Sequence, residues 1–156
     1  MSRVHMENIT CIACGKESPY RYWDMIDPMM NQETKDKVLS GELFTFTCKH
    51  CGAKRRVTYD TIYQEVAKGR TFHLVTSEES YMQAVNIYAD RDSHSSPVLA
   101  HEIVRIVLSQ NQLAEKIRIF DEGLDDRIVE IIKAYFLSQL YEQEQDIQVD
   151  EVLFFV

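Results

Sequence analysis

The first half of the chain alternates between apolar and polar positions in several short stretches. A period of two is typical of strands that bury one face, because successive side chains of a strand point to opposite sides. Turn residues separate these stretches, as at Lys68–Gly69–Arg70. We therefore expect short strands over four ranges: 20–23, 43–47, 55–63 and 71–75.

A helix is expected between the first two of these strands. Asp27 can cap a helix, and Pro28 fits its first position, where the N–H that proline lacks would have no helical partner. The helix is expected to end near Ser40, because Gly41 can adopt the left-handed conformation that often follows a helix.

A polar stretch over residues 90–97 separates two parts of the chain with different patterns. Clusters of Asp, Ser and Pro are typical of loops. We therefore expect a β-rich region, 1–89, and an α-rich region, 90–156, that pack as one compact unit, with a further short strand at 105–108. The predicted fold class is α+β: zinc-ribbon-like antiparallel hairpins with an inserted helix, followed by a helical segment packed on the sheet.

Two helices are expected after that strand. Ser109 begins a capping-box pattern, which predicts a helix that ends before Gly123. Asp125 or Asp126 then caps a longer helix over residues 125–141. Its apolar positions recur at helical spacing and predict one wide face. They are Ile128, Ile131, Ile132, Tyr135, Phe136 and Leu140.

All four cysteines fall into two matching knuckles, each with two residues between its cysteines and a glycine after the second. One tight turn of this kind aims two sulfurs at the same ion, and two turns complete the four-ligand shell that zinc prefers. A site of four thiolates leaves no open position and is therefore structural. The predicted ligands of one Zn²⁺ are Cys11, Cys14, Cys48 and Cys51.

The knuckles are expected at the ends of β-hairpins, which is the layout of a zinc ribbon. The 33 residues between Cys14 and Cys48 exceed what a minimal ribbon needs, in agreement with an inserted helix. A thioredoxin-like redox pair would lie in a βαβ pattern, which the sequence does not display. Disulfides would need an oxidising compartment, whereas the first residues contain no apolar signal segment. We therefore expect a cytoplasmic protein.

The net charge of -8 is unevenly distributed. Residues 1–70 contain 11 Lys and Arg against 9 Asp and Glu, whereas residues 71–156 contain 6 against 16. This is not the basic footprint of a nucleic-acid-binding chain. No run of residues approaches the roughly 18 apolar residues of a membrane span, so no membrane partner is expected.

One local group of cations nevertheless surrounds the second knuckle, close in sequence to Phe44, Phe46 and Tyr59. Such a patch can hold a nucleic-acid strand by phosphate contacts and base stacking. It can also be a solvated rim whose positive charge offsets the thiolate site, and the acidity of the chain favours this interpretation. The residues of the nucleic-acid alternative are Lys49, Lys54, Arg55 and Arg56.

Several motifs occur together in an order that is specific as a combination. They are the two knuckles, the segment Leu39–Ser40–Gly41–Glu42–Leu43–Phe44 and the later stretches 105–107, 113–117 and 123–130. Over roughly residues 8–133 the chain resembles the CpXC family of bacterial proteins. The family pattern has proline after the first cysteine of each knuckle, where this chain has Ile12 and Lys49. The resemblance implies a metal on the four cysteines and implies no activity.

We expect a protein-interaction module stapled by zinc. Its partner is another protein or a second copy of the chain, bound through the apolar face of the helix over 125–141 and a strand predicted at 149–156. That strand pairs with another chain or continues beyond Val156. The alternative is a nucleic-acid-associated zinc ribbon. An enzyme is not expected, because the sequence contains no nucleophile elbow, no glycine-rich phosphate loop and no other residue to which a catalytic role can be assigned.

Overall fold

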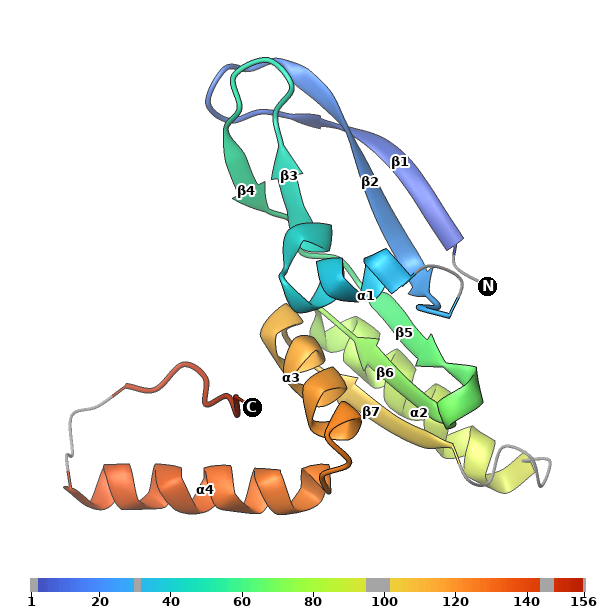
Figure 1. Cartoon of the computed structure of the whole chain (residues 1–156), viewed down its shortest axis with the longest axis vertical. Helices are drawn as coiled ribbons and strands as arrows, with labels where there is room; N and C mark the ends of the chain where they lie inside the picture. Colours follow the sequence, from blue (N-terminus) through green and yellow to red (C-terminus); the bar gives the residue numbers. More distant parts are fainter. Residues whose placement is uncertain (1–2, 30–31, 95–101, 144–147, 156) are drawn as a thin grey trace. The chain divides into compact units, whose positions relative to one another are not determined.

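The computed structural model describes residues 3–29, 32–94, 102–143 and 148–155 (Figure 1). These residues form an α+β fold of two sheets and four α-helices, which confirms the predicted class. The main sheet has five strands in the order β1-β2-β5-β6-β7. They are β1 (Arg3–Thr10), β2 (Glu17–Ile26), β5 (Thr61–Glu65), β6 (Arg70–Leu74) and β7 (Ile103–Val107).

A smaller antiparallel sheet pairs β3 (Thr45–Thr47) with β4 (Lys54–Arg56). The helices are α1 (Gln32–Leu39), α2 (Glu78–His94), α3 (Gln110–Asp121) and α4 (Asp126–Gln143), with short 3-10 helices η1 (Glu42–Phe44) and η2 (Val66–Lys68). The chain forms two compact units, Met1–Leu113 and Ala114–Val156, and the division falls within α3. No helix among the described residues has both the length and the apolar character that a membrane crossing requires.

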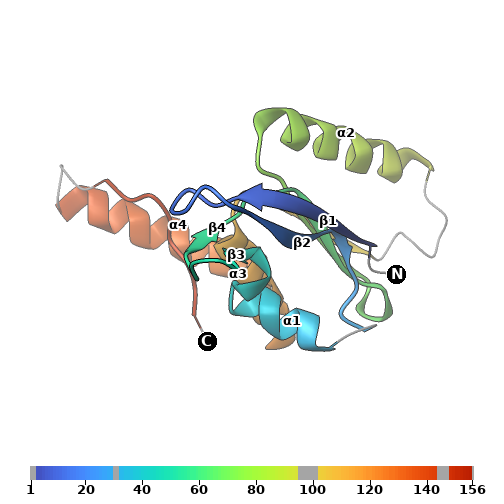
Figure 2. The same cartoon turned by 90° about the horizontal axis from the view of Figure 1, so that it is seen from above.

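The main sheet is mixed, whereas the sequence analysis expected antiparallel strands alone. The pairs β1–β2 and β5–β6 are antiparallel, and the pairs β2–β5 and β6–β7 are parallel. Parallel neighbours need a crossover connection, and α2 provides it between β6 and β7. Figure 2 shows α1 and α2 on opposite sides of the main sheet. The chain therefore contains a βαβ unit, contrary to the sequence analysis, but the cysteines lie outside it.

Helix α2 is the main element that the sequence analysis missed. It runs to His94, so residues 90–94 of the predicted loop are helical, while 95–97 lie outside the described residues. The predicted boundary after residue 89 falls within this helix. The hydrophobic pattern did not indicate this helix because, among its described side chains, only Ala84 is buried. A local signal does exist: Ser80 N–H donates to Ser77 Oγ at 3.1 Å and Ser77 N–H to Ser80 Oγ at 3.2 Å, a reciprocal cap.

Two predicted strands are shorter than expected. Residues 43–44 belong to η1, so only Thr45–Thr47 form β3. The range 55–63 is divided between β4 and β5, which lie in different sheets. The pairing with the first hairpin strand extends to Val57, whose N–H donates to the carbonyl of Phe44 at 2.9 Å, and β5 begins only at Thr61.

The helix expected from Pro28 begins later. Asp27 Oδ1 accepts the N–H of Met29 at 3.1 Å, and residues 28–29 form a turn. Helix α1 begins at Gln32 in the described residues. Its predicted end is confirmed, because Gly41 has a left-handed conformation with φ of 74°.

The caps predicted in the second half are confirmed. Ser109 Oγ accepts the N–H of Gln112 at 3.0 Å, as the N-cap of α3 should. Gly123 follows α3 with φ of 69°. Asp125 Oδ1 then accepts the N–H of Arg127 at 3.0 Å and caps α4.

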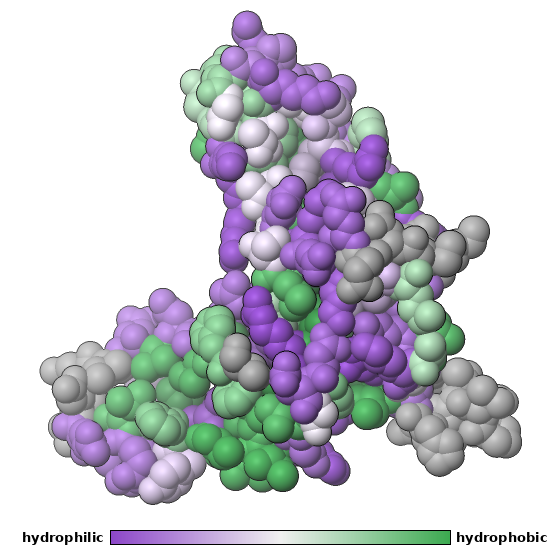
Figure 3. Space-filling view, viewed as in Figure 1, coloured by the Kyte–Doolittle hydropathy of each residue, from purple (hydrophilic) through white to green (hydrophobic). Residues whose placement is uncertain are grey.

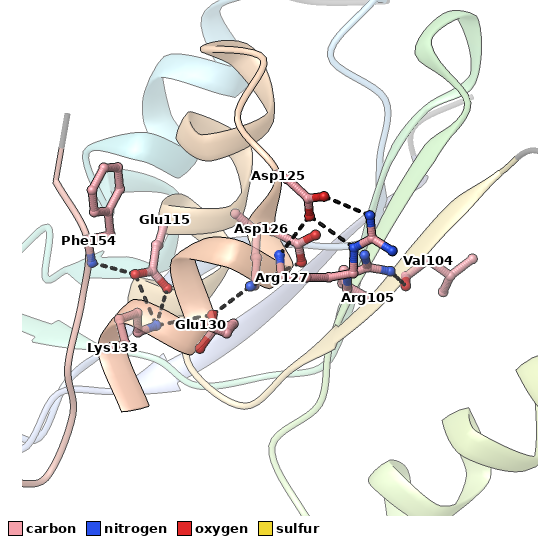
Figure 4. Close-up of polar contacts among 10 residues, drawn as sticks. Val104, Arg105, Glu115, Asp125, Asp126, Arg127, Glu130, Lys133 and Phe154 are labelled. Atoms are coloured by element: carbon pink, nitrogen blue, oxygen red, sulfur yellow. Dashed lines mark hydrogen bonds and ion pairs between the residues drawn. The ribbon is translucent and has the colours of Figure 1, made fainter. Parts of the chain in front are cut away.

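The strand predicted at 149–156 is wrong for the residues described there. Residues 148–155 contain no strand. The N–H of Phe154 donates to the side chain of Glu115 instead of to a strand backbone (Figure 4). An alternating pattern forms a strand only when a partner strand is present, and none of the described strands pairs with this segment.

A network of ion pairs holds α3 and α4 together within the second unit (Figure 4). Lys133 Nζ lies 2.9 Å from Glu115 Oε2 and 3.2 Å from Glu130 Oε1. Lys116 Nζ lies 2.6 Å from Glu130 Oε1 and 3.3 Å from Asp126 Oδ2. Burial opposes the ionised form of Glu130, but hydrogen bonds from the two lysines hold its pKa below the usual value. Helix α4 thus directs its central charged side chains toward α3.

Candidate metal centre

The two knuckles lie at the ends of two hairpins and fold in the same way. The first knuckle joins β1 to β2, and the second joins β3 to β4 (Figure 1). In each, the N–H of the first cysteine donates to the carbonyl five residues later, and the N–H four residues later donates back, with all four distances between 2.8 and 2.9 Å. Gly15 and Gly52 have φ of 70° and 75° with open space around the missing Cβ. Their left-handed conformation, and not crowding, therefore favours glycine.

This geometry brings the four predicted sulfur ligands together. Cys11 Sγ lies 3.6 Å from Cys51 Sγ, and Cys14 Sγ lies 3.7 Å from Cys48 Sγ. All four ligand atoms lie within 4.8 Å of one another. Four sulfurs at about 2.3 Å from a central zinc ion, in a tetrahedron, would be about 3.8 Å apart. The cysteines are free, and their spacing is far from the roughly 2.05 Å of a disulfide.

The pKa values of Cys48 and Cys51 support a positive ion between the sulfurs. Burial of Cys48 opposes its thiolate, but hydrogen bonds from the N–H of His50 and the hydroxyl of Ser18 lower its pKa to about 6. The N–H of Ala53 favours the thiolate of Cys51, yet the neighbouring thiols and burial raise its pKa to about 12. The thiolate of Cys48 is therefore favoured, whereas the neighbouring thiols disfavour the thiolate of Cys51. A positive ion between the sulfurs removes this repulsion, so the donor set fits a divalent metal.

Ser18 supports the centre, although the sequence analysis did not identify it. Its side chain is buried, lies 3.6 Å from Cys48 Sγ and accepts the N–H of Lys49 at 3.1 Å. The available signal was the alternation along β2, where Ser18 and Tyr20 are both buried. His50 is not a ligand, because its Nε2 lies 3.1 Å from the backbone oxygen of Glu17 and it is absent from the sulfur group.

An aromatic cluster packs against the buried cysteine of each knuckle. Cys11 and Cys48 are buried with Tyr20 and Phe46 in one group, and Tyr59 packs against it. The ring of Tyr20 meets the rings of Phe46 and Tyr59 edge-on, with centroids 6.2 and 6.3 Å away. The buried cysteine of each knuckle is therefore part of a small core that also joins the two hairpins.

The predicted basic rim lies on and beside β4. Lys54, Arg55 and Arg56 are consecutive, exposed residues of β4, so their side chains alternate between the two faces of the small sheet, and Lys49 is exposed in the knuckle itself. The guanidinium of Arg55 lies 5.9 Å from the centroid of the Phe46 ring. Arg56 Nη1 donates to Asn111 Oδ1 at 3.2 Å. Two of the four cations thus already contact other side chains of the chain.

Residues 9–133, which are most of the chain, match the CpXC protein family. The chain belongs to the CpXC family. No curated protein and no solved structure matches it. The family match together with the four clustered cysteines is compatible with a metal-binding module.

This CpXC protein replaces both prolines of the knuckle pattern. Ile12 is 84% exposed, so the replacement there changes no buried contact. At position 49 the backbone N–H of Lys49 donates to Ser18 Oγ, a bond that proline could not make. The replacement at position 49 therefore adds a hydrogen bond beside Cys48.

Proposed function

We propose that this CpXC protein is a protein-interaction module stapled by one Zn²⁺. The observation that carries the proposal is the group of four cysteine sulfurs within 4.8 Å of one another. Tetrahedral sets of four thiolates suit zinc or iron. Zinc is the choice here because a structural site of four cysteines in paired knuckles is typical of zinc, whereas an iron–sulfur cluster would also need inorganic sulfide.

The zinc has a structural role in this proposal. It joins the β1–β2 hairpin to the β3–β4 hairpin through two cysteines from each. With four protein ligands it has no open position for a substrate or a reactive water. Free thiols and a zinc–thiolate centre persist in a reducing compartment, so we place the protein in the cytoplasm. The ribbon then provides a rigid support for surfaces that bind another protein.

Native mass spectrometry tests the metal assignment. We expect the wild-type chain to carry one zinc ion, and we expect release of that ion to coincide with the appearance of four thiols that react with a thiol reagent. The variant Cys51→Ser should retain less zinc, whereas Thr47→Ser, an exposed neighbour on β3, should retain it fully. A folded wild-type chain without metal and with ordinary thiol reactivity would contradict the proposal.

A second candidate function is nucleic-acid binding through the basic rim. It is favoured by three consecutive exposed cations on β4 and by the position of Arg55 over the ring of Phe46. Against it stand the excess of Asp and Glu over the whole chain and the small number of cations in the rim. Four phosphate contacts give a weak interaction that falls steeply with salt.

We therefore predict no submicromolar binding to DNA or RNA at ~150 mM salt, which is physiological ionic strength. Filter binding over a range of salt concentrations measures this directly. The double variant Arg55→Gln and Arg56→Gln should then behave like the wild type, and so should the control Arg127→Gln, a cation of the second unit. Submicromolar binding that only the double variant abolishes would instead establish the nucleic-acid function.

A further inference from the structure

Helix α4 carries a broad apolar surface that faces solvent. Ile128, Ile131, Ile132, Tyr135 and Phe136 are each more than half exposed, and we name these five residues the α4 face. Their spacing of three, four, seven and eight residues places them on one side of the helix. Figure 3 shows apolar side chains gathered over the region of α4. Leu140, which the sequence analysis assigned to the same face, is half-buried instead.

The opposite side of α4 is occupied within its own unit. Asp126 and Val129 are buried, and Lys133 reaches the carboxylate of Glu115 on α3. At 100° per residue these positions lie on the other side of the helix from Tyr135. The charged side chains near the middle of the helix therefore point into the second unit, and no described element of that unit covers the α4 face.

The chemistry of the α4 face restricts what can cover it. The five residues of the face are uncharged, so covering it buries no unpaired charge. Residues 114–156 contain 4 Lys and Arg against 11 Asp and Glu. An anionic membrane or a nucleic acid would be repelled, because helices that bind such surfaces surround their apolar face with cations. The remaining occupant is an apolar protein surface.

We infer that the occupant is a second copy of this chain, bound through the α4 face of each copy in an antiparallel two-fold pair. This inference names the partner in the proposed function and rests on it. A two-fold interface places one patch against itself, which requires a self-complementary surface. An uncharged apolar face satisfies this condition, and antiparallel helices also place opposite dipole ends side by side.

The size of the α4 face is sufficient for such a pair. Five large side chains that are half to two-thirds exposed present roughly 500 Å² of apolar surface. Two copies would bury about 1,000 Å², which is the lower limit for a specific interface. An apolar patch of this size lies toward the upper end of what monomers expose, and such patches are often functional. The expected dimer is therefore specific, with a dissociation constant on the order of micromolar.

The strength of this dimer should depend on salt in an unusual direction. Each copy brings an excess of seven negative charges in residues 114–156 to the pair. Salt screens repulsion between like charges and leaves apolar contacts intact. Dimerisation should thus become stronger, and not weaker, as the salt concentration rises.

Sedimentation velocity on the full zinc-loaded chain, at protein concentrations from about 1 to 100 μM, tests the inference around the expected micromolar constant. We expect a monomer–dimer equilibrium that shifts toward dimer in high salt. Ile132→Glu should remain monomeric at the highest concentration. Ala134→Glu is the matched control, because Ala134 is exposed on the same helix beside the α4 face, and it should still dimerise. Circular dichroism on both variants checks that the helices are retained.

The inference would be overturned by a monomeric wild type over the whole range, by a dimer that persists in Ile132→Glu, or by equal loss of the dimer in Ala134→Glu. A dimer that dissociates as salt rises would do the same. Each of these leaves the proposed function standing if the chain still holds one zinc ion by native mass spectrometry. A chain that carries no zinc but still dimerises through the α4 face would instead contradict the proposed function and support the dimer interface.

Discussion

Replacing Cys48 with serine will unfold the two hairpins of the metal centre and leave the helices of the second unit largely intact. Cys48 is buried and belongs to the small core under the knuckles, so the variant loses a ligand and exposes an aromatic cluster. In zinc-finger peptides metal binding supplies on the order of 10 kcal/mol of folding free energy. We expect the second unit to keep its helices, because its charges pair within α3 and α4.

The near-ultraviolet circular dichroism, to which the packed rings of Tyr20 and Tyr59 contribute, should decrease markedly, while the helical signal at 222 nm should decrease much less. A strong zinc chelator should have the same effect on the wild type and no further effect on Cys48→Ser. Thr47→Ser, an exposed position on β3, serves as the control and should behave like the wild type. Retention of the near-ultraviolet signal after chelation would contradict a structural metal.

Glu65→Gln should destabilise the first unit strongly. Glu65 faces Arg70 across the β5–β6 pair and forms a hydrogen bond with it, and both side chains are only 5% exposed. Lys35 and Lys68 approach the same carboxylate at 3.6 and 3.5 Å. Glutamine keeps the shape of the side chain but removes the negative charge that Arg70 faces in this buried pair. Breaking a buried pair in this way costs about 3–5 kcal/mol of the free energy of unfolding.

Urea unfolding at pH 7 measures this loss, and Glu33→Gln is the control because Glu33 forms an exposed pair with Lys37 at 2.5 Å. The pH dependence gives a second readout. Burial opposes the ionised form of Glu65, but the hydrogen bond and charge of Arg70, with Lys35 and Lys68, hold its pKa below the usual 4.5. A lowered pKa stabilises the folded state above about pH 4.5 and loses this contribution as the pH falls through the native pKa. The difference in the free energy of unfolding between wild type and Glu65→Gln should therefore shrink below pH 4.5. A difference that does not change with pH would mean that the loss comes from altered packing and not from the missing charge.

Features set by a few neighbouring residues were predictable from the sequence. The knuckles, the cap at Ser109 and the left-handed Gly41 depend on residues within one turn of each other. The gathering of the four sulfurs could also be predicted, because metal chemistry fixes how many ligands of each kind must meet.

Features that depend on distant residues could not be predicted. Helix α2 buries only Ala84 fully among its described side chains, so its sequence lacks an apolar stripe. Because α2 was not predicted, the sequence offered no helix that could connect β6 and β7 as parallel neighbours. The segment after residue 148 has a strand pattern but no partner strand among the described residues. The ion pair of Glu115 with Lys133 could not be predicted either, because a helical pattern does not show which charged residues of another helix lie nearby.

The junction between β2 and β5 has a consequence for how the first unit opens. These two strands share only two register pairs, Met25 with Ile62 and Ile26 with Tyr63, whereas β5 and β6 share five. Few backbone hydrogen bonds therefore connect the hairpin that carries Cys11 and Cys14 to the rest of the sheet. Regions joined so narrowly open as separate cooperative segments. Fraying of β1 and β2 is then a local event with a smaller free energy than global unfolding, and the knuckle cysteines Cys11 and Cys14 can move away from Cys48 and Cys51 without loss of the β5–β6–β7 layer.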